Sequence, residues 1–405
     1  MRRDPVVLRT TDSPSHPKKH SKEELTDFEI VERGRQFRCV AFRCVVSSYQ
    51  GLEWGSVARS DHGNCHKSVI QSSSKASGVS SAKSVTAIDW LLDSDPAIRW
   101  QVMRDLTGAP PELVAAERGR IAREGWGARL LDLQGEDGQW AGGACFPSQS
   151  IYQSVKNQGQ PWISTLPTLQ LLHDFGIDPH SDRVRRAVAM VRDGCRWENA
   201  GQPFFSGEVE PCINGRVVAL GTYFDQNVDA IVARLLVEQL KDGGWNCEVE
   251  NGSVRSSFAT TINVLEGLLA HERATGGSRE SIAARHQGEE YLLERKLFRR
   301  KSTGEVVNPA WLQFSFPTRW NYDVLRGLDY FRSVGDAPDS RVDEAVNLLR
   351  SKRQSDGTWL LENTRPGKAY FALEDGDGRS SRWNTLRALR VLRWYDQTAQ
   401  AHKMA

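Results

Sequence analysis

The stretch QLKDGGWNCE (Gln239–Glu248) follows the apolar run IVARLLVE and decides the fold class. The pair Gly243–Gly244 can adopt the left-handed backbone conformation that commonly ends helices, because glycine has no Cβ atom to clash. Trp245 then has a large apolar surface to bury directly after the turn. The sequence therefore predicts a helix that ends near Gln239 and a tryptophan that packs just beyond that end.

The same spacing recurs elsewhere in the chain. The stretch LLDLQGEDGQW (residues 130–140) repeats it, and the tails ARLLDLQ and ARLLVEQ ahead of the two turns are alike. A third copy, NLLRSKRQSDGTW, ends in Trp359, but its Gln354 stands one residue too close to the glycine. Self-similarity of this kind indicates stacked supersecondary units rather than one irregular core.

Composition excludes several classes of protein. A formal net charge of +2 over 405 residues gives no argument for a nucleic-acid partner, and none is expected. No apolar run reaches the ~18–20 residues that span a membrane, and the basic N-terminus lacks an apolar stretch of signal-peptide length. Seven cysteines without CxxC or zinc-finger spacing fit reduced thiols best. We therefore expect a cytoplasmic protein without a transmembrane segment.

The first part of the chain, residues 1–84, differs from the rest. It is rich in Ser, Lys, Arg and His, and the segment SVIQSSSKASGVSSAKS is close to low complexity. Such a composition buries too little apolar surface to offset the entropy lost on ordering. We expect a poorly ordered N-terminal extension over residues 1–84 and a helical domain over residues 85–400.

Helical segments of two kinds alternate from residue 85 onward. The first kind begins with charged residues and ends near a turn signal: residues 112–134, 181–197, 227–240, 281–298 and 339–353, with SVTAIDWLL as a sixth member. The second kind follows polar, Gly-rich or aromatic loops: residues 95–106, 162–175, 213–224, 256–271, 318–331 and 381–395. Six helical hairpins predict an all-α fold, an α/α6 toroid whose inner barrel is the second kind. An open solenoid of helix pairs is the alternative.

The Gln-x3-Gly-x-Trp pattern of Gln239, Gly243 and Trp245 resembles the QW motif of the squalene cyclase and protein prenyltransferase superfamily. The resemblance covers roughly residues 87–396. It implies an α/α toroid in which the Gln and Trp tie neighbouring outer helices together. It also implies an isoprenoid-sized ligand in a central cavity.

The catalytic motifs of that superfamily do not match this sequence. Neither the DxDD motif of squalene cyclases nor the DDxxD motif of ionising terpene synthases occurs. The zinc-binding Asp-x-Cys of protein prenyltransferases has only a distant counterpart in Glu210-Pro211-Cys212, and no His begins a later inner helix. The resemblance therefore implies the fold and leaves open whether the protein is an enzyme. We expect no metal and no cofactor.

Three inner segments begin alike, with Arg-Trp followed by Asn or Gln, and a closed ring makes them neighbours. One interpretation is a cationic sector of the cavity that holds a diphosphate or carboxylate. The alternative is that the Trp side chains pack between the barrels and the Arg side chains pair with outer-helix carboxylates. The candidate ligand-binding residues are Arg99, Trp100, Arg216, Tyr223, Trp320, Asn321, Arg326, Trp383, Asn384 and Arg387.

Four residues are candidates for acid–base chemistry. Glu208 and Glu210 lie in the loop FFSGEVEPCINGR, where burial would raise a carboxyl pKa and make a general acid. Tyr322 and Asp323 form either an acid–base pair or a buried hydrogen-bonded pair that stabilises a helix start. The sequence leaves both alternatives open.

Three cysteines, Cys145, Cys212 and Cys247, occupy comparable loops before inner segments, and their thiols could meet at one rim of the ring. Their wide spacing and the lack of a histidine argue against a metal site. Whether they meet in space is left open.

The leading functional hypothesis is a terpenoid cyclase- or prenyltransferase-like protein whose aromatic cavity stabilises a carbocation. One alternative is a non-catalytic toroid that binds a small ligand or a protein. Another is a carbohydrate-active toroid with paired carboxylates such as Glu208 and Asp323.

Overall fold

The structure is a computed structural model that describes residues 86–404, with side chains described through residue 397. The expected extension, residues 1–84, lies outside the described residues. Within the described part helices are the main regular structure, joined by long loops and accompanied by one antiparallel pair of short strands, β1 (Trp359–Leu360) and β2 (Ser380–Ser381). No helix between residues 86 and 404 is both long and apolar enough to cross a bilayer.

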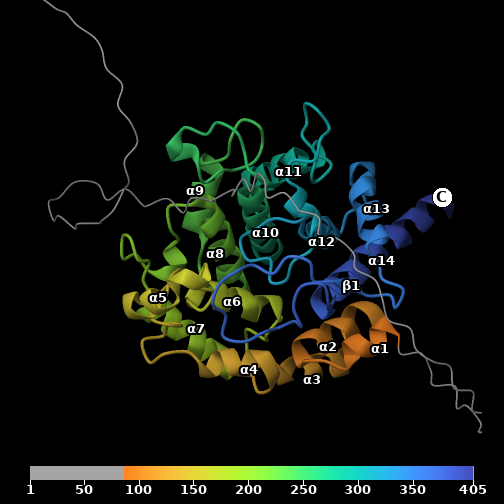
Figure 1. Cartoon of the computed structure of the whole chain (residues 1–405). Coiled ribbons are helices and arrows are strands. Elements are labelled where there is room, and N and C mark those ends of the chain that lie inside the picture. Colours follow the sequence, from red (N-terminus) through yellow and green to blue (C-terminus); the bar gives the residue numbers. More distant parts are fainter. Residues whose placement is uncertain (1–85, 405) are drawn as a thin grey trace, which may run out of the picture. The chain divides into compact units, whose positions relative to one another are not determined.

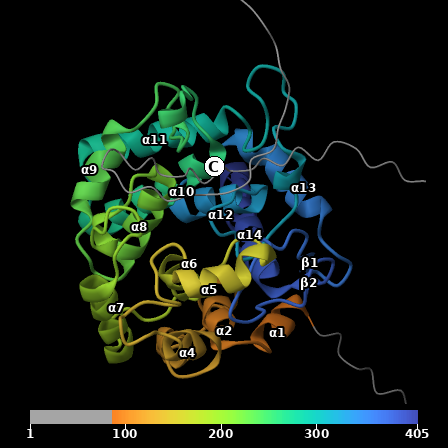
Figure 2. The same cartoon turned by 60° about the vertical axis from the view of Figure 1, so that its left-hand side comes forward.

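Among the residues that the structure describes, six helices form an inner barrel and six an outer one. Figures 1 and 2 show their arrangement from two sides. The inner helices are α2 (Pro96–Val102), α6 (Thr165–Asp174), α8 (Pro211–Tyr223), α10 (Phe258–Thr275), α12 (Val324–Val334) and α14 (Arg382–Met404). The outer helices are α1 (Ala87–Leu92), α4 (Gly125–Asp132), α7 (Asp182–Gly194), α9 (Asp229–Val237), α11 (Arg279–Leu293) and α13 (Asp343–Ser351). Two further helices lie between inner and outer elements: α3 (Pro111–Arg120) and α5 (Gln149–Val155).

Burial distinguishes the two barrels. On inner helix α8 every residue from Asn214 to Gly221 is buried, so this helix is covered on all sides. Outer helix α7 instead buries one stripe, at the helical spacing expected of a surface helix: Val184, Ala187, Val188 and Val191.

The ring is closed. Successive inner helices α6, α8, α10, α12 and α14 contact one another, and α14 contacts α2 at the start of the domain. Arg390 on α14 donates to the side chain of Gln101 at 2.7 Å, and Gln101 in turn donates to the carbonyl of Asp174 at 3.1 Å. The prediction of an all-α toroid is therefore confirmed, and the open solenoid is excluded.

Helices α8 and α10 approach especially closely. A Cβ atom on Gly215 would lie 2.5 Å from the carbonyl oxygen of Asn263, and one on Gly267 would lie 2.2 Å from that of Gly215. Only glycine fits where two backbones come this near. This contact fixes the wall of the ring from which Arg216 extends.

Each repeated tryptophan makes the same pair of contacts. The indole N–H of Trp245 donates to the carbonyl of Leu235 on outer helix α9 at 2.7 Å, while its backbone N–H donates to Thr261 Oγ1 on inner helix α10 at 3.1 Å. The two other copies repeat both bonds, with Trp140 on Leu130 and Thr165, and Trp359 on Leu349 and Thr385. We call this arrangement the tryptophan clasp. It joins the end of an outer helix to the inner helix that follows.

The glutamines of the repeat link neighbouring outer helices. Gln239 donates through Nε2 to the carbonyl of Gly243 at 2.7 Å and to that of Ala284 on α11 at 2.8 Å. Gln134 makes the equivalent bonds from α4 to α7. Gln354 is exposed, and its side chain donates to the nearby carbonyl of Lys352 at 2.9 Å. The offset third copy therefore keeps the tryptophan contacts and loses the glutamine link.

Two expected helices have different limits. The segment 112–134 is two helices, because Gly125 takes a positive φ of 66° and the Asp95 carboxylate accepts a bond from Trp126 N at 2.8 Å where α4 begins. The segment 318–331 becomes helical only at Val324, with Asp323 as its N-cap. Residues 318–323 are therefore loop, which matters for the site below.

Replacing Gln239 by leucine should lower the free energy of unfolding by about 1–3 kcal/mol, since it leaves two carbonyls without their donor. The matched control is Gln354→Leu, which removes an exposed side chain and should change stability by less than about 0.5 kcal/mol. Denaturant unfolding of both variants measures the difference. Equal stability of the two variants would contradict the proposed link between outer helices.

Candidate functional site

Several predicted site residues meet around the loop that precedes α12. Asp323 caps this helix: its Oδ1 accepts from Arg326 N at 2.8 Å and its Oδ2 accepts from the Ser315 hydroxyl at 2.8 Å. Arg326 also donates to the carbonyl of Asn321 at 2.6 Å, and Arg387 donates to that of Ser315 at 3.3 Å. Asp323, Asn321, Arg326 and Arg387 are thus brought together around this loop.

Tyr322 points away from Asp323's partners. Its hydroxyl donates to the carbonyl of Leu297 at 2.7 Å, and its ring packs against Phe258 and Trp311, each with centroids 5.2 Å away. Burial, reinforced by the neighbouring Asp323 charge, raises the pKa of the Tyr322 hydroxyl. Because both polar groups are already bonded, these contacts favour a structural role at the helix start over an acid–base pair.

Three of the predicted ligand-binding residues pack instead around α3. Arg99 pairs with Glu117 at 2.5 Å. Trp100 donates to the carbonyl of Phe175 at 2.8 Å, and the Tyr223 hydroxyl accepts from Arg118 at 3.0 Å. The residues of the predicted cationic sector therefore do not all lie together. On α2, Arg99 pairs with a carboxylate and Trp100 packs against its neighbours, as the alternative interpretation of the sequence expected.

The remaining predicted residues border the same loop. Trp383 stacks on Phe316 with centroids 4.3 Å apart, and Asn384 donates to the carbonyl of Leu360 at 3.0 Å. Trp320 is half-buried, and its carbonyl accepts from Asn263 at 2.9 Å. These contacts fix the loop against α10 and α14.

The most unusual feature of the interior is a set of three arginines, Arg216, Arg319 and Arg365, which we call the arginine group. Arg216 extends from α8, Arg319 from the loop before α12, and Arg365 from the loop between β1 and β2. Each has a buried guanidinium nitrogen without a hydrogen-bond partner, and none forms an ion pair within the described residues. Arg216 and Arg319 are only 5% and 6% exposed.

Burial and mutual repulsion act on these guanidinium groups together. Burial and Arg216 lower the pKa of Arg319 to about 9, and burial and Arg326 lower the pKa of Arg216 to about 10. Burial also lowers the pKa of Arg365. Both values remain above neutral pH, so Arg216 and Arg319 are charged at pH 7.

Nearby carboxylates do not balance this charge. Glu266 is occupied by Arg326, which it contacts at 2.8 Å, and Asp323 is occupied as a helix cap. Asp174 acts on Arg216 and Arg319 only through its field and makes no ion pair with either. Four guanidinium groups therefore face three carboxylates. A surplus positive charge in a buried site is costly unless an anion neutralises it.

Arg319 is held in a strained backbone conformation. Its φ is +56°, a region that costs a non-glycine residue roughly 1–3 kcal/mol. Its guanidinium lies over the ring of Trp162, 5.0 Å from the centroid. An aromatic face supports a cation without providing a hydrogen-bond acceptor, so the guanidinium N–H groups stay available.

The loop of residues 361–379, which we call the cover loop, crosses from the β strands toward α6 (Figure 1). It docks on the segment before α6: Trp162 donates to the carbonyl of Lys368 at 2.7 Å and to that of Pro366 at 2.9 Å. The Tyr370 hydroxyl donates to the carbonyl of Ile163 at 2.8 Å. The cover loop thereby brings Arg365 toward Arg326 and Asp323, whose charges both act on it.

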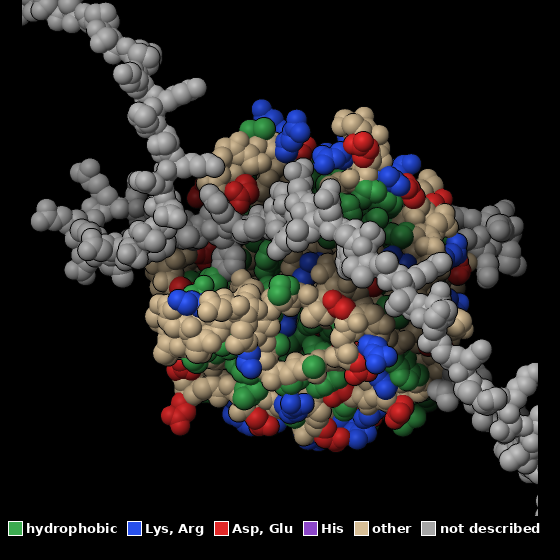
Figure 3. Space-filling view, viewed as in Figure 1, with side chains coloured by type: hydrophobic (Ala, Val, Ile, Leu, Met, Phe, Trp, Pro, Cys, Tyr) green, Lys and Arg blue, Asp and Glu red, His purple; other side chains and the backbone are tan. Residues whose placement is uncertain are grey.

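The face seen in Figure 3 is hollowed near its centre, where hydrophobic side chains gather with a few basic ones among them. Acidic and basic side chains are instead interspersed along the lower edge of the molecule in this view.

Glu208 is fixed within its own loop. It is 5% exposed, and its carboxylate accepts from Asn199 Nδ2 at 3.0 Å and from the backbone N–H of Glu210 at 3.1 Å. Asn214 Nδ2 donates to the carbonyl of Glu208 at 2.7 Å. These bonds favour a structural role for Glu208 over that of a general acid.

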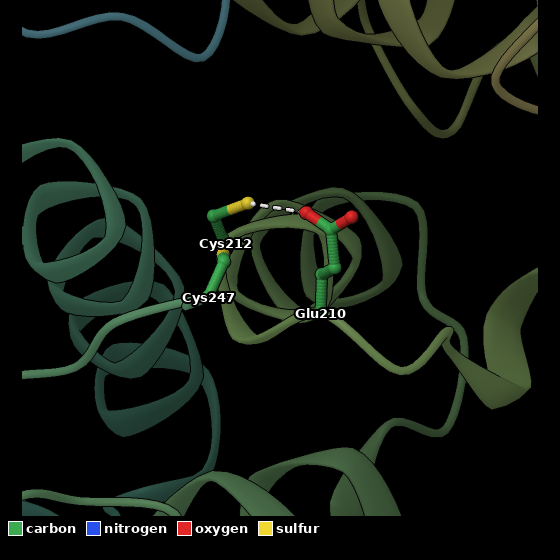
Figure 4. A group of neighbouring side chains, drawn as sticks. All are labelled: Glu210, Cys212 and Cys247. Atoms are coloured by element: carbon green, nitrogen blue, oxygen red, sulfur yellow. Dashed lines mark hydrogen bonds between the residues drawn. The ribbon is translucent and has the colours of Figure 1, made fainter. Parts of the chain in front are cut away.

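Glu210 lies beside two of the three cysteines that the sequence singled out (Figure 4). The ligand atoms of Glu210, Cys212 and Cys247 all lie within 4.8 Å of one another. Burial raises the pKa of the Glu210 carboxyl. Cys145 is not part of this group; its backbone N–H donates to Glu198 at 2.8 Å.

Sequence reasoning missed Arg319 and Arg365 as site residues. Arg319 does begin one of the three Arg-Trp starts, and what distinguishes it from Arg99 is the absence of a partner like Glu117. That difference depends on residues far away in the chain. Arg365 lies in a loop with no repeat or motif, so no sequence signal marked it.

Comparison with known proteins finds distant structural similarity only. No protein-family model and no curated protein matches the sequence. A protein from Actinoplanes is 15% identical with a TM-score of 0.37, the match covering 76% of this chain and 90% of that one. A type II terpene cyclase from Scytonema, solved in complex with the substrate geranylgeranyl dihydroxybenzoate, is 16% identical with a TM-score of 0.33, covering 77% and 88%.

Replacing Arg216 or Arg319 by methionine should raise the free energy of unfolding of the ligand-free protein by about 1–4 kcal/mol, because each change removes an unpaired buried charge. Arg326→Met is the matched control. It strands Glu266 and should lower stability by about 3–5 kcal/mol. Thermal and denaturant unfolding distinguish the two outcomes. Destabilisation by all three changes would mean that Arg216 and Arg319 are paired after all.

Replacing Gly367 by alanine should undock the cover loop, because the new Cβ atom would lie 1.7 Å from the carbonyl oxygen of Gln160. Gly376→Ala is the control, since Gly376 also has a positive φ but has no atom within 4 Å of its Cβ position. A docking loss of about 1–2 kcal/mol raises the open fraction roughly 5–30-fold. Limited proteolysis within residues 361–379 should rise by that factor in the first variant only.

Proposed function

We propose that this toroid encloses an apolar small molecule of isoprenoid type that carries a negatively charged group. The observation that carries the proposal is the pair of buried, charged and unpartnered guanidinium groups of Arg216 and Arg319. Two neighbouring guanidinium groups suit a carboxylate or diphosphate, whose oxygens can accept several N–H bonds at once. Burying these two guanidinium groups without a partner costs free energy, and a bound anion would offset that cost.

The apolar part of the ligand is inferred from the walls. Trp162 lies under Arg319, and the stacked pair Phe316 and Trp383 borders the same loop. Aromatic faces beside a cationic site favour a long apolar chain with an anionic head over a sugar, which needs many hydrogen-bonding partners. Glu208 and Asp323 are each occupied by bonds within their own loops, which weakens the carbohydrate-active alternative.

Arg365 and the cover loop complete the enclosure in this proposal. The loop is held by hydrogen bonds to the segment around Trp162, so a ligand within the ring is shielded from water. Removal of water strengthens each charge-assisted bond to the ligand. The proposed function is therefore retention of an anionic isoprenoid, and any chemistry on it uses groups other than the bonded Tyr322 and Asp323.

The experiment is a thermal-shift titration with matched probes: an isoprenoid diphosphate, an isoprenoid carboxylic acid, the corresponding neutral alcohol, and inorganic diphosphate. The wild type should be stabilised by at least one anionic isoprenoid, and ligand at 100 times Kd adds about 2.7 kcal/mol. The neutral alcohol should give a much smaller shift. Arg216→Met and Arg319→Met should remove the difference between acid and alcohol.

The control for this experiment is Arg99→Met, which removes an arginine that is paired with Glu117 on α3. It should lower the melting temperature yet leave the ligand-induced shift unchanged. A wild-type shift of equal size for the acid and the alcohol would overturn the anionic part of the proposal. An absence of any shift with all four probes would overturn the isoprenoid part.

A further inference from the structure

Two thiols and one carboxylate converge where α8 begins, separately from the arginine group (Figure 4). Glu210 is the N-cap residue of α8 and Cys212 is its second residue, while Cys247 follows the clasp residue Trp245 in the next hairpin. All three ligand atoms lie within 4.8 Å of one another. Tetrahedral zinc with Zn–S bonds of about 2.3 Å holds its ligand atoms roughly 3.3–3.8 Å apart, so the group needs only small side-chain adjustments.

The carboxylate and one of the thiols are already in contact. The Cys212 Sγ lies 3.5 Å from a Glu210 oxygen and donates to it. Because a metal is bound by the deprotonated thiolate, one divalent cation would take the place of the thiol protons, and metal binding would release them.

Pro211 and the tryptophan clasp hold the three ligand residues in place, and these residues remain partly exposed to solvent. Pro211 starts α8 between the two ligands Glu210 and Cys212, and Cys247 follows the tryptophan clasp. The Thr260 hydroxyl lies 3.4 Å from the Cys247 Sγ as an outer hydrogen-bond donor. All three ligand residues are half-buried, so an ion can reach them. Ligands fixed in this way before an ion arrives favour tight binding.

We propose that Glu210, Cys212 and Cys247 bind one thiophilic divalent cation, zinc by preference, with a fourth coordination position open to water or to a ligand. Two thiolates select a soft or borderline metal over Mg²⁺ or Ca²⁺, which require oxygen ligands. Three protein ligands with one open position are typical of zinc sites that bind a further molecule rather than of closed structural sites. The sequence expectation of no metal rested on the wide spacing of these residues and on the lack of a histidine. Folding removes the first objection, and the Glu210 carboxylate takes the place of a histidine in the proposed ligand set.

The position of the site relates it to the ring interior. Cys212 and Arg216 are four residues apart on α8, so both lie on the same helix face, one turn from each other. A molecule held by Arg216 would thus lie near the open position of the ion. The metal site itself does not depend on the proposed anion function, and the two can be tested separately.

The test uses the full-length protein, reduced and stripped of metal, titrated with Co²⁺ and then with Zn²⁺ against a chromophoric chelator. The wild type should take up one ion with a thiolate-to-cobalt charge-transfer band that zinc abolishes. Cys212→Ser and Cys247→Ser should each weaken zinc binding by about 100-fold or more, and Glu210→Gln by about 10–100-fold. Cys145→Ser is the matched control, a half-buried cysteine outside the group, and should keep the wild-type affinity.

A second measurement avoids dependence on the folding of any variant. Zinc should protect Cys212 and Cys247 of the wild-type protein from thiol alkylation, read by peptide mass spectrometry, while Cys145 is labelled at an unchanged rate. Equal zinc affinity in the Cys212→Ser/Cys247→Ser double variant would overturn the proposal. So would a reduced wild-type protein whose two thiols show no protection, or one in which they form a disulfide and take up no metal. The Cys212→Ser variant should still be stabilised by the anionic isoprenoid probes. Failure of the metal proposal can therefore be told apart from failure of the anion proposal.

Discussion

The ring depends on a single repeated hydrogen bond, the indole N–H of a buried tryptophan donating to a carbonyl of the outer helix that precedes it. Trp140, Trp245 and Trp359 each make it at 2.7–2.8 Å, and all three are fully buried. A buried indole N–H without an acceptor would be costly, so the turn between helices has little freedom. This constraint fixes how the chain enters the inner helices α6, α10 and α14, on which the three clasps end.

The same constraint explains how far the fold could be predicted. The tryptophan and the glycine of each turn act within a few residues of one another, so their pattern is visible in the sequence. The break at Gly125 was not, because it depends on the carboxylate of Asp95, which belongs to another hairpin. The start of α12 at Val324 was also missed. The residues Trp320 and Asn321 match the pattern that begins the other inner helices, but the helix is capped by Asp323 and begins after it.

The candidate site was predictable only in part, for a related reason. Arg216, Arg326 and Arg387 were all candidates, but which of them is unpaired depends on acids from other helices. Glu266 on α10 occupies Arg326, whereas nothing described occupies Arg216. Pairing across a ring is a property of three-dimensional contacts, and a pattern of charges along one helix does not contain it. The sequence left open whether Cys145, Cys212 and Cys247 meet, for the same reason; in the structure Cys212 and Cys247 do, and Cys145 lies outside their group.

The cover loop has a consequence for how fast a bound molecule can leave. Its docking uses the backbone N–H and the indole N–H of Trp162, the residue whose ring also supports Arg319. One side chain therefore serves both the closure and the charged wall. If an anion is bound as proposed, opening the loop disturbs Trp162, whose ring supports Arg319, so exchange of the bound molecule is coupled to loop motion. A more tightly held occupant should then also slow the opening of the loop, a kind of motion that takes microseconds to seconds in proteins.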